Sequence, residues 1–253
     1  MKNKDDKYWE EQAIYKDKLL DKYIKRLENK LLKSFKKAKK EVLNELKIIY
    51  SDIEASEYIK YQIESLLIRI NYSIDKLYKE TEENSTEEFI LLFLLMYKLA
   101  SKDIEASFNV IDKKIVKEIL SGNWSGITYS DRLLEHKRKL LFNIREEINK
   151  AIIRGDSLAE ASRILSNKFD ISFNNAKRLI NTEACWVMNE ATIQCYKDNN
   201  IKEFEFVAIL DSRTSKTCRG MDGKRFKVDE CVIGVNCPPL HINCRSSIRH
   251  AIK

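Results

Sequence analysis

Residues that interrupt helices are scarce in this chain, and their scarcity limits the folds open to it. Six glycines and two prolines occur among 253 residues. Both residue types mark turns and disfavour helix interiors, so long helices joined by few loops are expected. Three of the glycines and both prolines lie within residues 201–253. The sequence therefore predicts a helical body followed by a loop-rich tail.

Apolar residues recur at helical spacing through the first part of the chain. From Leu20 to Ile49 their mean step is about 3.6 residues, the period of an α-helix, which predicts one long amphipathic helix. The pattern continues over residues 52–80. Ser85 and Glu88 then have the spacing of a capping box, so we expect a new helix to start at Ser85.

The second half of the helical body contains further start and stop signals. Residues 130–152 have an apolar face, and Gly155 is suited to the left-handed conformation that ends a helix. Ser157 and Glu160 form a second capping box. A short helix is expected to about Lys168, followed by a long helix over residues 172–197.

After Asn200 the period changes. Residues 203–210, EFEFVAIL, alternate and are rich in aromatic and β-branched side chains, which predicts a strand. The predicted fold is mainly α, with an extended long-helix body over residues 1–200 and a small α+β domain over residues 201–253. A domain this small usually needs a metal or another staple, and zinc is the candidate.

Charge and hydropathy exclude several classes of protein. Hydrophobic residues make up 43% and charged residues 34% of the chain, which disfavours both a disordered and a membrane protein. The most apolar run, residues 89–97, is nine residues long, whereas a membrane helix needs about 20. No signal or transit peptide is recognisable, so the protein is expected to stay in the cytoplasm in which it is made.

The two ends of the chain are basic. Residues 1–50 carry a net charge of +6 and residues 211–253 one of +5. Such ends attract DNA or acidic protein surfaces. For the N-terminal segment, lysines interleaved with glutamates favour a solvated helix face instead.

The tail concentrates residues that bind soft metal ions. His241 and Cys244 have the HxxC spacing that can place an imidazole and a thiolate on one ion. Cys218 supplies a third ligand from a separate loop. Clustered cysteines in a reducing compartment bind metal more often than they form disulfides. These three residues are therefore candidate ligands of a structural zinc ion.

The fourth ligand is open. Cys237 is the first candidate because it lies four residues before His241, across two prolines. Cys231 is the reserve, followed by Asp222. Without a CxxC pair, an equally weighted interpretation is that these side chains pack and hydrogen-bond a turn without metal.

An enzymatic site is the weaker interpretation. Asp211, Asp222 or Glu230 could serve as acid or base beside a metal. The sequence nevertheless contains no HExxH, no GxSxG and no phosphate-binding glycine loop, and it has only three histidines. We therefore expect a protein that is not an enzyme.

The tail motifs resemble those of a known family. DSRTS, then Cys218 with MDG, then GVN, PPLH and NCRS are similar, in order and spacing, to the C-terminal motif of Mu F-like phage minor head proteins. The resemblance extends to NTEACWVMNEA at residues 181–191, to NWSG and SDRL within residues 123–133, and to KYWEEQ near the start. It covers nearly the whole chain.

The resemblance implies a role and partners. It implies a minor capsid, or head morphogenesis, protein of a tailed phage that associates with the portal, is present in several copies, and assists head assembly and DNA packaging or ejection. The portal protein, major capsid or scaffold proteins and phage DNA would be its partners, and the virion head, assembled in the bacterial host cytoplasm, its location.

The resemblance also bears on the metal and on enzymatic activity. Many family members carry CxxC where this chain has Ser215 and Cys218, so Cys237 would have to replace the missing thiolate. Some members carry a toxin or ADP-ribosyltransferase domain after the motif; because this chain ends at Lys253, we expect no such activity. A DNA-binding module with a zinc-ribbon-like tail and a metal hydrolase are the alternatives.

Overall fold

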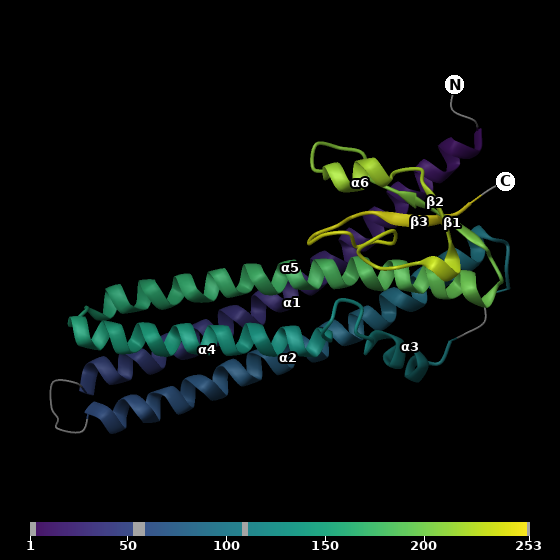
Figure 1. Cartoon of the computed structure of the whole chain (residues 1–253). Coiled ribbons are helices and arrows are strands. Elements are labelled where there is room, and N and C mark those ends of the chain that lie inside the picture. The colour runs from purple at the N-terminus through teal and green to yellow at the C-terminus, as the bar shows by residue number, and fades with distance from the viewer. Residues whose placement is uncertain (1–3, 53–58, 108–110, 252–253) are drawn as a thin grey trace. The chain divides into compact units, whose positions relative to one another are not determined.

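Helices dominate the structure, a computed structural model that describes residues 4–52, 59–107 and 111–251. The helices that precede the first strand are α1 (Lys4–Asp52), α2 (Ile59–Asp103), α3 (Lys113–Leu120), α4 (Tyr129–Arg154) and α5 (Leu158–Asp198) (Figure 1). The predicted mainly helical fold is confirmed.

The tail folds as a small α+β structure, as predicted. Its elements are β1 (Glu203–Val207), α6 (Lys216–Met221), β2 (Arg225–Lys227), a 3-10 turn (Val228–Glu230) and β3 (Ser247–His250). The strands form an antiparallel sheet in the order β2-β1-β3. Phe204 pairs with Phe226 across one edge of β1, and Phe206 pairs with Ile248 across the other.

The chain divides into two compact units that are each built from separated segments. Unit 1 comprises Met1–Leu27, Ser85–Tyr129 and Arg178–Lys253, and unit 2 comprises Glu28–Asn84 and Ser130–Lys177. The tail therefore belongs to unit 1. The predicted domain boundary at residue 200 instead separates two continuous segments, and it stays a prediction.

Unit 2 has an aromatic and aliphatic interior. Phe35 of α1 packs edge-on against Tyr78 of α2, with ring centroids 6.1 Å apart, and against Phe173 of α5 at 5.7 Å. The Tyr78 hydroxyl hydrogen-bonds Ser172 at 2.9 Å. Burial raises the pKa of Tyr78 to about 12, so it stays protonated and available as a donor.

The predicted helix start at Ser85 is wrong, because α2 runs through it without interruption. Ser85 is fully buried and accepts a hydrogen bond from the Tyr129 hydroxyl at 2.7 Å. Glu88 binds Arg26 of α1 at 3.0 Å. Both side chains have tertiary partners, so the resemblance to a capping box does not mark a helix end here.

The predicted break between Lys168 and residue 172 is also wrong, since α5 is continuous. Leu165, Phe169 and Ala176 are buried at helical spacing, so one apolar face runs through the predicted break. The capping box at its start is confirmed: Ser157 Oγ accepts a hydrogen bond from the Glu160 amide, and the Glu160 carboxylate accepts one from the Ser157 amide. Gly155, with φ of 68°, ends α4 as expected.

The apolar run at residues 89–97 lies inside α2, and Phe93 and Leu92 are almost completely buried. Among the described residues, no helix has an apolar stretch long enough to cross a membrane.

Candidate metal centre

Two short turns place the three predicted ligands. Ser215 caps the N-terminus of α6, where its hydroxyl accepts a hydrogen bond from the Cys218 amide at 3.1 Å. His241 and Cys244 lie in the loop before β3, and the Cys244 amide closes that turn on the His241 carbonyl at 3.2 Å. Asn243, between them, has φ of 57°, a left-handed conformation that asparagine tolerates.

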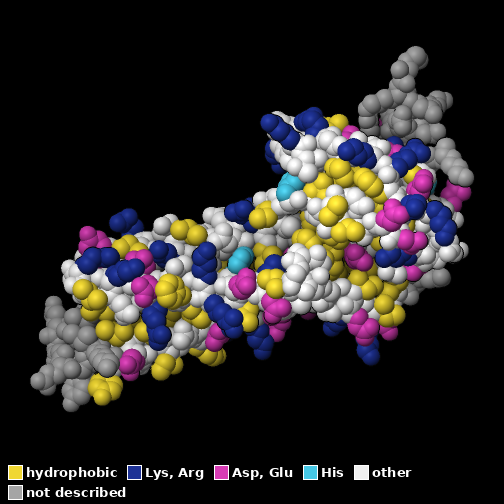
Figure 2. Space-filling view, viewed as in Figure 1, with side chains coloured by type: hydrophobic (Ala, Val, Ile, Leu, Met, Phe, Trp, Pro, Cys, Tyr) yellow, Lys and Arg dark blue, Asp and Glu magenta, His cyan; other side chains and the backbone are white. Residues whose placement is uncertain are grey.

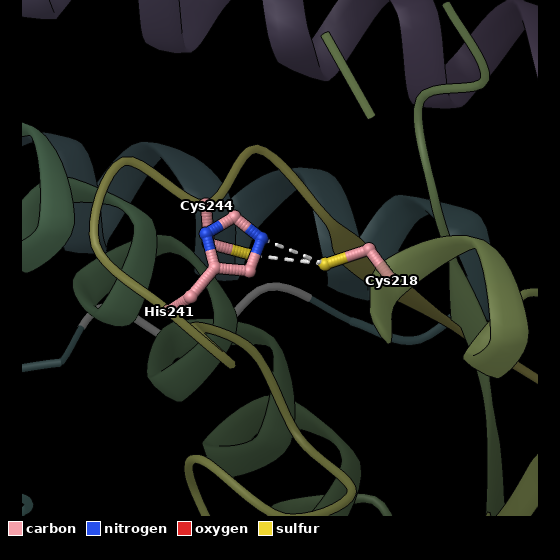
Figure 3. A group of neighbouring side chains, drawn as sticks. All are labelled: Cys218, His241 and Cys244. Atoms are coloured by element: carbon pink, nitrogen blue, oxygen red, sulfur yellow. Dashed lines mark hydrogen bonds between the residues drawn. The ribbon is translucent and has the colours of Figure 1, made fainter. Parts of the chain in front are cut away.

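The side chains of Cys218, His241 and Cys244 converge (Figure 3). Cys218 Sγ lies 3.1 Å from His241 Nε2 and 3.7 Å from Cys244 Sγ. All three ligand atoms lie within 4.8 Å of one another, and no other such group of His, Cys, Asp or Glu occurs among residues 4–52, 59–107 and 111–251. The spacing analysis therefore identified three side chains that do meet.

The distance between the sulfurs fits a metal site better than a disulfide. Two thiolates bound to zinc at about 2.3 Å with tetrahedral angles lie about 3.8 Å apart, close to the 3.7 Å between Cys218 and Cys244. A disulfide requires about 2.05 Å, and all six cysteines are free. The two sulfurs therefore fit two corners of a tetrahedral zinc site, and His241 Nε2 lies beside them.

The thiols hold their protons when no metal is bound. The hydrogen bond with Cys244, together with burial, raises the pKa of Cys218 to about 12. The pKa of Cys244 is also raised, chiefly through its hydrogen bond with Cys185. Metal binding at this cluster must therefore release protons, because zinc binds thiolates.

The structure does not bring Cys237, the predicted fourth ligand, into this group. A backbone bridge between Ile233 and Cys237 and the turn around Gly234 fix its position. There its thiol contacts Cys231, the reserve candidate, and burial raises its pKa well above the usual value. Proximity in sequence did not indicate the direction of the side chain.

The other reserve ligand and the candidate acids have separate partners. Asp222 accepts a hydrogen bond from the Ala208 amide at 2.8 Å, and Glu230 binds Lys227 at 2.8 Å. Asp211 binds Arg245 at 2.7 Å, and this guanidinium, with the neighbouring backbone donors, holds the pKa of Asp211 well below its usual range. None of the three belongs to the cluster of possible ligands.

Helix α5 anchors the loop that contains His241 and Cys244, here called the metal loop. It does so through side chains that the sequence analysis did not assign to the site. Thr182 Oγ1 accepts a hydrogen bond from the Asn243 amide at 3.1 Å. Asn189 donates from Nδ2 to the Ser246 carbonyl at 3.2 Å and to the Cys185 carbonyl at 2.8 Å. The signal was present in the sequence as the motif NTEACWVMNEA.

Comparison with known proteins places this arrangement in a family. Residues 142–249 match the family described as Phage Mu protein F like protein, and that range contains the α5 motif and the whole Cys218, His241 and Cys244 cluster. This region is similar to the Mu F-like family. The resemblance found in the sequence is confirmed, and it supports a phage head morphogenesis protein.

A curated relative of the chain is the NAD(+)--arginine ADP-ribosyltransferase EFV of Enterococcus faecalis (strain ATCC 700802 / V583). It is 27% identical over 135 residues, which are 51% of this chain and 28% of the relative. The chain thus spans less than a third of that protein. No solved structure matches the chain.

The loop that contains NWSG packs against α5 within the region that matches the family. Trp124 stacks on Trp186 of α5, with an interplanar angle of 20° and a centroid distance of 6.1 Å. Its Nε1 donates to the buried Glu183 carboxylate at 3.0 Å. These two contacts fix the loop to the face of α5.

A small hollow opens beside the cluster. It has about 230 Å³ of open space, and its lining includes Cys218 and His241 together with Ser215, Arg213 and Arg245. Ser215 is thus next to the ligands but already caps α6.

Proposed function

We propose that this chain is a structural minor head protein of a tailed phage that associates with the portal and assists head assembly and DNA packaging or ejection. The match of residues 142–249 to the Mu F-like family carries the proposal. The protein would act by binding other head components rather than by turnover. Mass spectrometry of purified heads should find several copies of this protein per head. Absence of the protein from heads would contradict the proposal.

Within this function, the tail would be a zinc-stapled element. Cys218, His241 and Cys244 would hold the ion, and zinc would supply a cross-link between α6 and the loop before β3. The 3.1 Å between Cys218 Sγ and His241 Nε2 and the match of the sulfur separation to a tetrahedral site support this assignment. Such a link suits a sheet of three short strands, which has little core of its own.

The zinc proposal is tested by elemental analysis of the full chain and of Cys244→Ser. We expect stoichiometric zinc in the parent and its loss, with a lower melting temperature, in Cys244→Ser. Cys231→Ser is the matched control, because Cys231 lies outside the cluster. A parent without zinc and an unchanged melt of Cys244→Ser would refute the staple and leave the head-protein proposal standing.

Contact with DNA would come from the basic tail. Lys216, Arg219 and Lys224 are exposed in and after α6, and Lys and Arg side chains gather over this part of the surface (Figure 2). The logarithm of the affinity for duplex DNA should fall steeply and linearly with the logarithm of the salt concentration. Reversal of these three charges should weaken retention, whereas Lys150→Glu in α4 should not. Retention that ignores salt would contradict a phosphate contact.

The transferase name of the relative requires a direct test of the non-enzyme proposal. The purified chain should consume no NAD⁺ and modify no arginine substrate above a buffer control. Turnover that persists in independent preparations would overturn this part of the proposal.

A further inference from the structure

A groove between α1 and α2 in unit 1 is not accounted for by the metal centre. Leu19 and Tyr23 of α1 and Leu95 of α2 form its apolar lining, and Lys22 and Arg26 of α1 complete it. It has about 410 Å³ of open space. The two helices run antiparallel here, since Lys16 pairs with Asp103 and Arg26 pairs with Glu88.

Exposed apolar residues extend the groove along both helices. Tyr15 lies four residues before Leu19 on the same face of α1, and Leu91 lies four residues before Leu95 on α2. Tyr15 is 49% exposed and Leu91 is 44% exposed. From residue 15 to residue 26, α1 rises roughly 16 Å, the length of three helical turns. An apolar groove of this length between two helices fits the ridge of a third helix.

The charged part of the lining is basic. Arg26 lies over the Tyr23 ring, 5.5 Å from its centroid, and binds Glu88 at 3.0 Å. Lys22 is exposed and has no ion-pair partner in the part of the chain that the structure describes. No acidic residue belongs to the lining. A partner with carboxylates beside its apolar face would therefore complement the groove.

We infer that this groove binds an amphipathic helix of another protein, with apolar residues on Leu19, Tyr23 and Leu95 and acidic residues beside Lys22 and Arg26. A second copy of this chain fits less well, because a symmetric contact through the groove would bring the same cations together. The inference goes beyond the proposed head role by naming the chemistry of a partner. It does not depend on zinc, since no residue of the cluster lines the groove.

Two fluorescein-labelled helical peptides test the inference on the full chain. They share one leucine-rich face and one length, but one carries glutamates and the other lysines beside that face. By fluorescence anisotropy, the glutamate peptide should bind saturably, and the lysine peptide at least about tenfold more weakly. Lys22→Glu should weaken the binding of the glutamate peptide and strengthen the binding of the lysine peptide. A general loss of structure would not produce this reversal.

Apolar variants complete the test. Leu95→Glu should weaken binding of the glutamate peptide at least about tenfold. Leu91→Glu provides the same test at a more exposed position if Leu95→Glu does not fold by circular dichroism. Phe142→Glu in unit 2, 64% exposed, is the control and should leave affinity unchanged.

Three results would overturn the inference: no binding of either peptide, equal binding of both, or binding that neither leucine variant weakens. Analytical ultracentrifugation covers self-association. A dimer of the parent chain that Leu91→Glu dissociates would assign the groove to a second copy instead.

Discussion

In unit 2, aromatic rings pack directly on one another, with Phe35 against both Tyr78 and Phe173, and the helices that carry them are 41 to 49 residues long. In the tail, three strands of three to five residues share a small cluster of buried apolar side chains that includes Phe206 and Ala208. Two of the remaining members are the possible zinc ligands Cys218 and Cys244.

The contrast shows how a small structure compensates for a small core. Long helices bury apolar side chains along their whole length, so unit 2 needs few polar contacts in its interior. The tail instead combines its few apolar contacts with hydrogen bonds from Thr182 and Asn189 of α5 and with the thiol–imidazole cluster. Its stability should therefore respond more strongly to polar and metal chemistry than the stability of unit 2.

The largest effect is expected from the centre of the tail core. Phe206→Ala removes a fully buried ring and should lower the free energy of unfolding by about 3 to 5 kcal/mol, measured by urea denaturation. Phe142→Ala, on an exposed ring, should cost little. Hydrogen exchange should accelerate within residues 203–250 and not within residues 59–80. Equal acceleration in both segments would break the comparison.

Removal of zinc should be next in size. At free zinc 100-fold above its dissociation constant, binding stabilises the fold by about 2.7 kcal/mol, which a chelator removes. The free thiols of Cys218 and Cys244 have raised pKa values, so the folded protein gives up protons when zinc binds. The zinc-dependent stability should therefore increase as pH rises and vanish as pH falls. A chelator effect that is constant between pH 6 and 8 would contradict thiolate ligation.

A smaller effect is expected at the α5 anchor. Asn189→Ala leaves the buried carbonyls of Cys185 and Ser246 without this donor and should cost about 2 kcal/mol. Asn174→Ala, at an exposed position of the same helix, is the control. If the zinc content of Asn189→Ala is also reduced, the anchor positions the metal loop as well as stabilising it. An unchanged free energy of unfolding in urea for Asn189→Ala would show that water replaces the Asn189 side-chain amide as the donor.

The smallest effect is expected at the start of α5. Ser157→Ala removes the hydroxyl that caps the helix and should cost about 1 kcal/mol. Ser157→Asp preserves a capping oxygen and should remain within a few tenths of a kcal/mol of the parent. A similar loss in both variants would indicate that the cap contributes through packing rather than through its hydrogen bond.

The spacing of apolar residues predicted the helices well, because the same residues are buried when the helices pack. Local start signals were less reliable: Ser157 caps a helix, whereas Ser85 lies inside one and binds Tyr129. The two serines have the same local pattern, and only the tertiary partner distinguishes them. Spacing found His241 and Cys244 because a short turn constrains nearby residues strongly, whereas Cys218 was found by its residue type, since it lies in a separate loop. It misplaced Cys237 because a backbone bridge at residue 233, invisible in the sequence, determines where that thiol lies.

The order of the segments along the chain has a consequence for folding during translation. Unit 2 is complete once residue 177 has left the ribosome, whereas unit 1 combines the start of the chain with its last 76 residues. The central strand β1 acquires its second neighbour, β3, only after residues 247–250 are synthesised. Because contacts between distant segments form slowly, the segments of α1 and α2 in unit 1 must wait for residues 178–253 before that unit is complete. Nascent chains that stall before residue 250 should therefore be targets for chaperones and proteases.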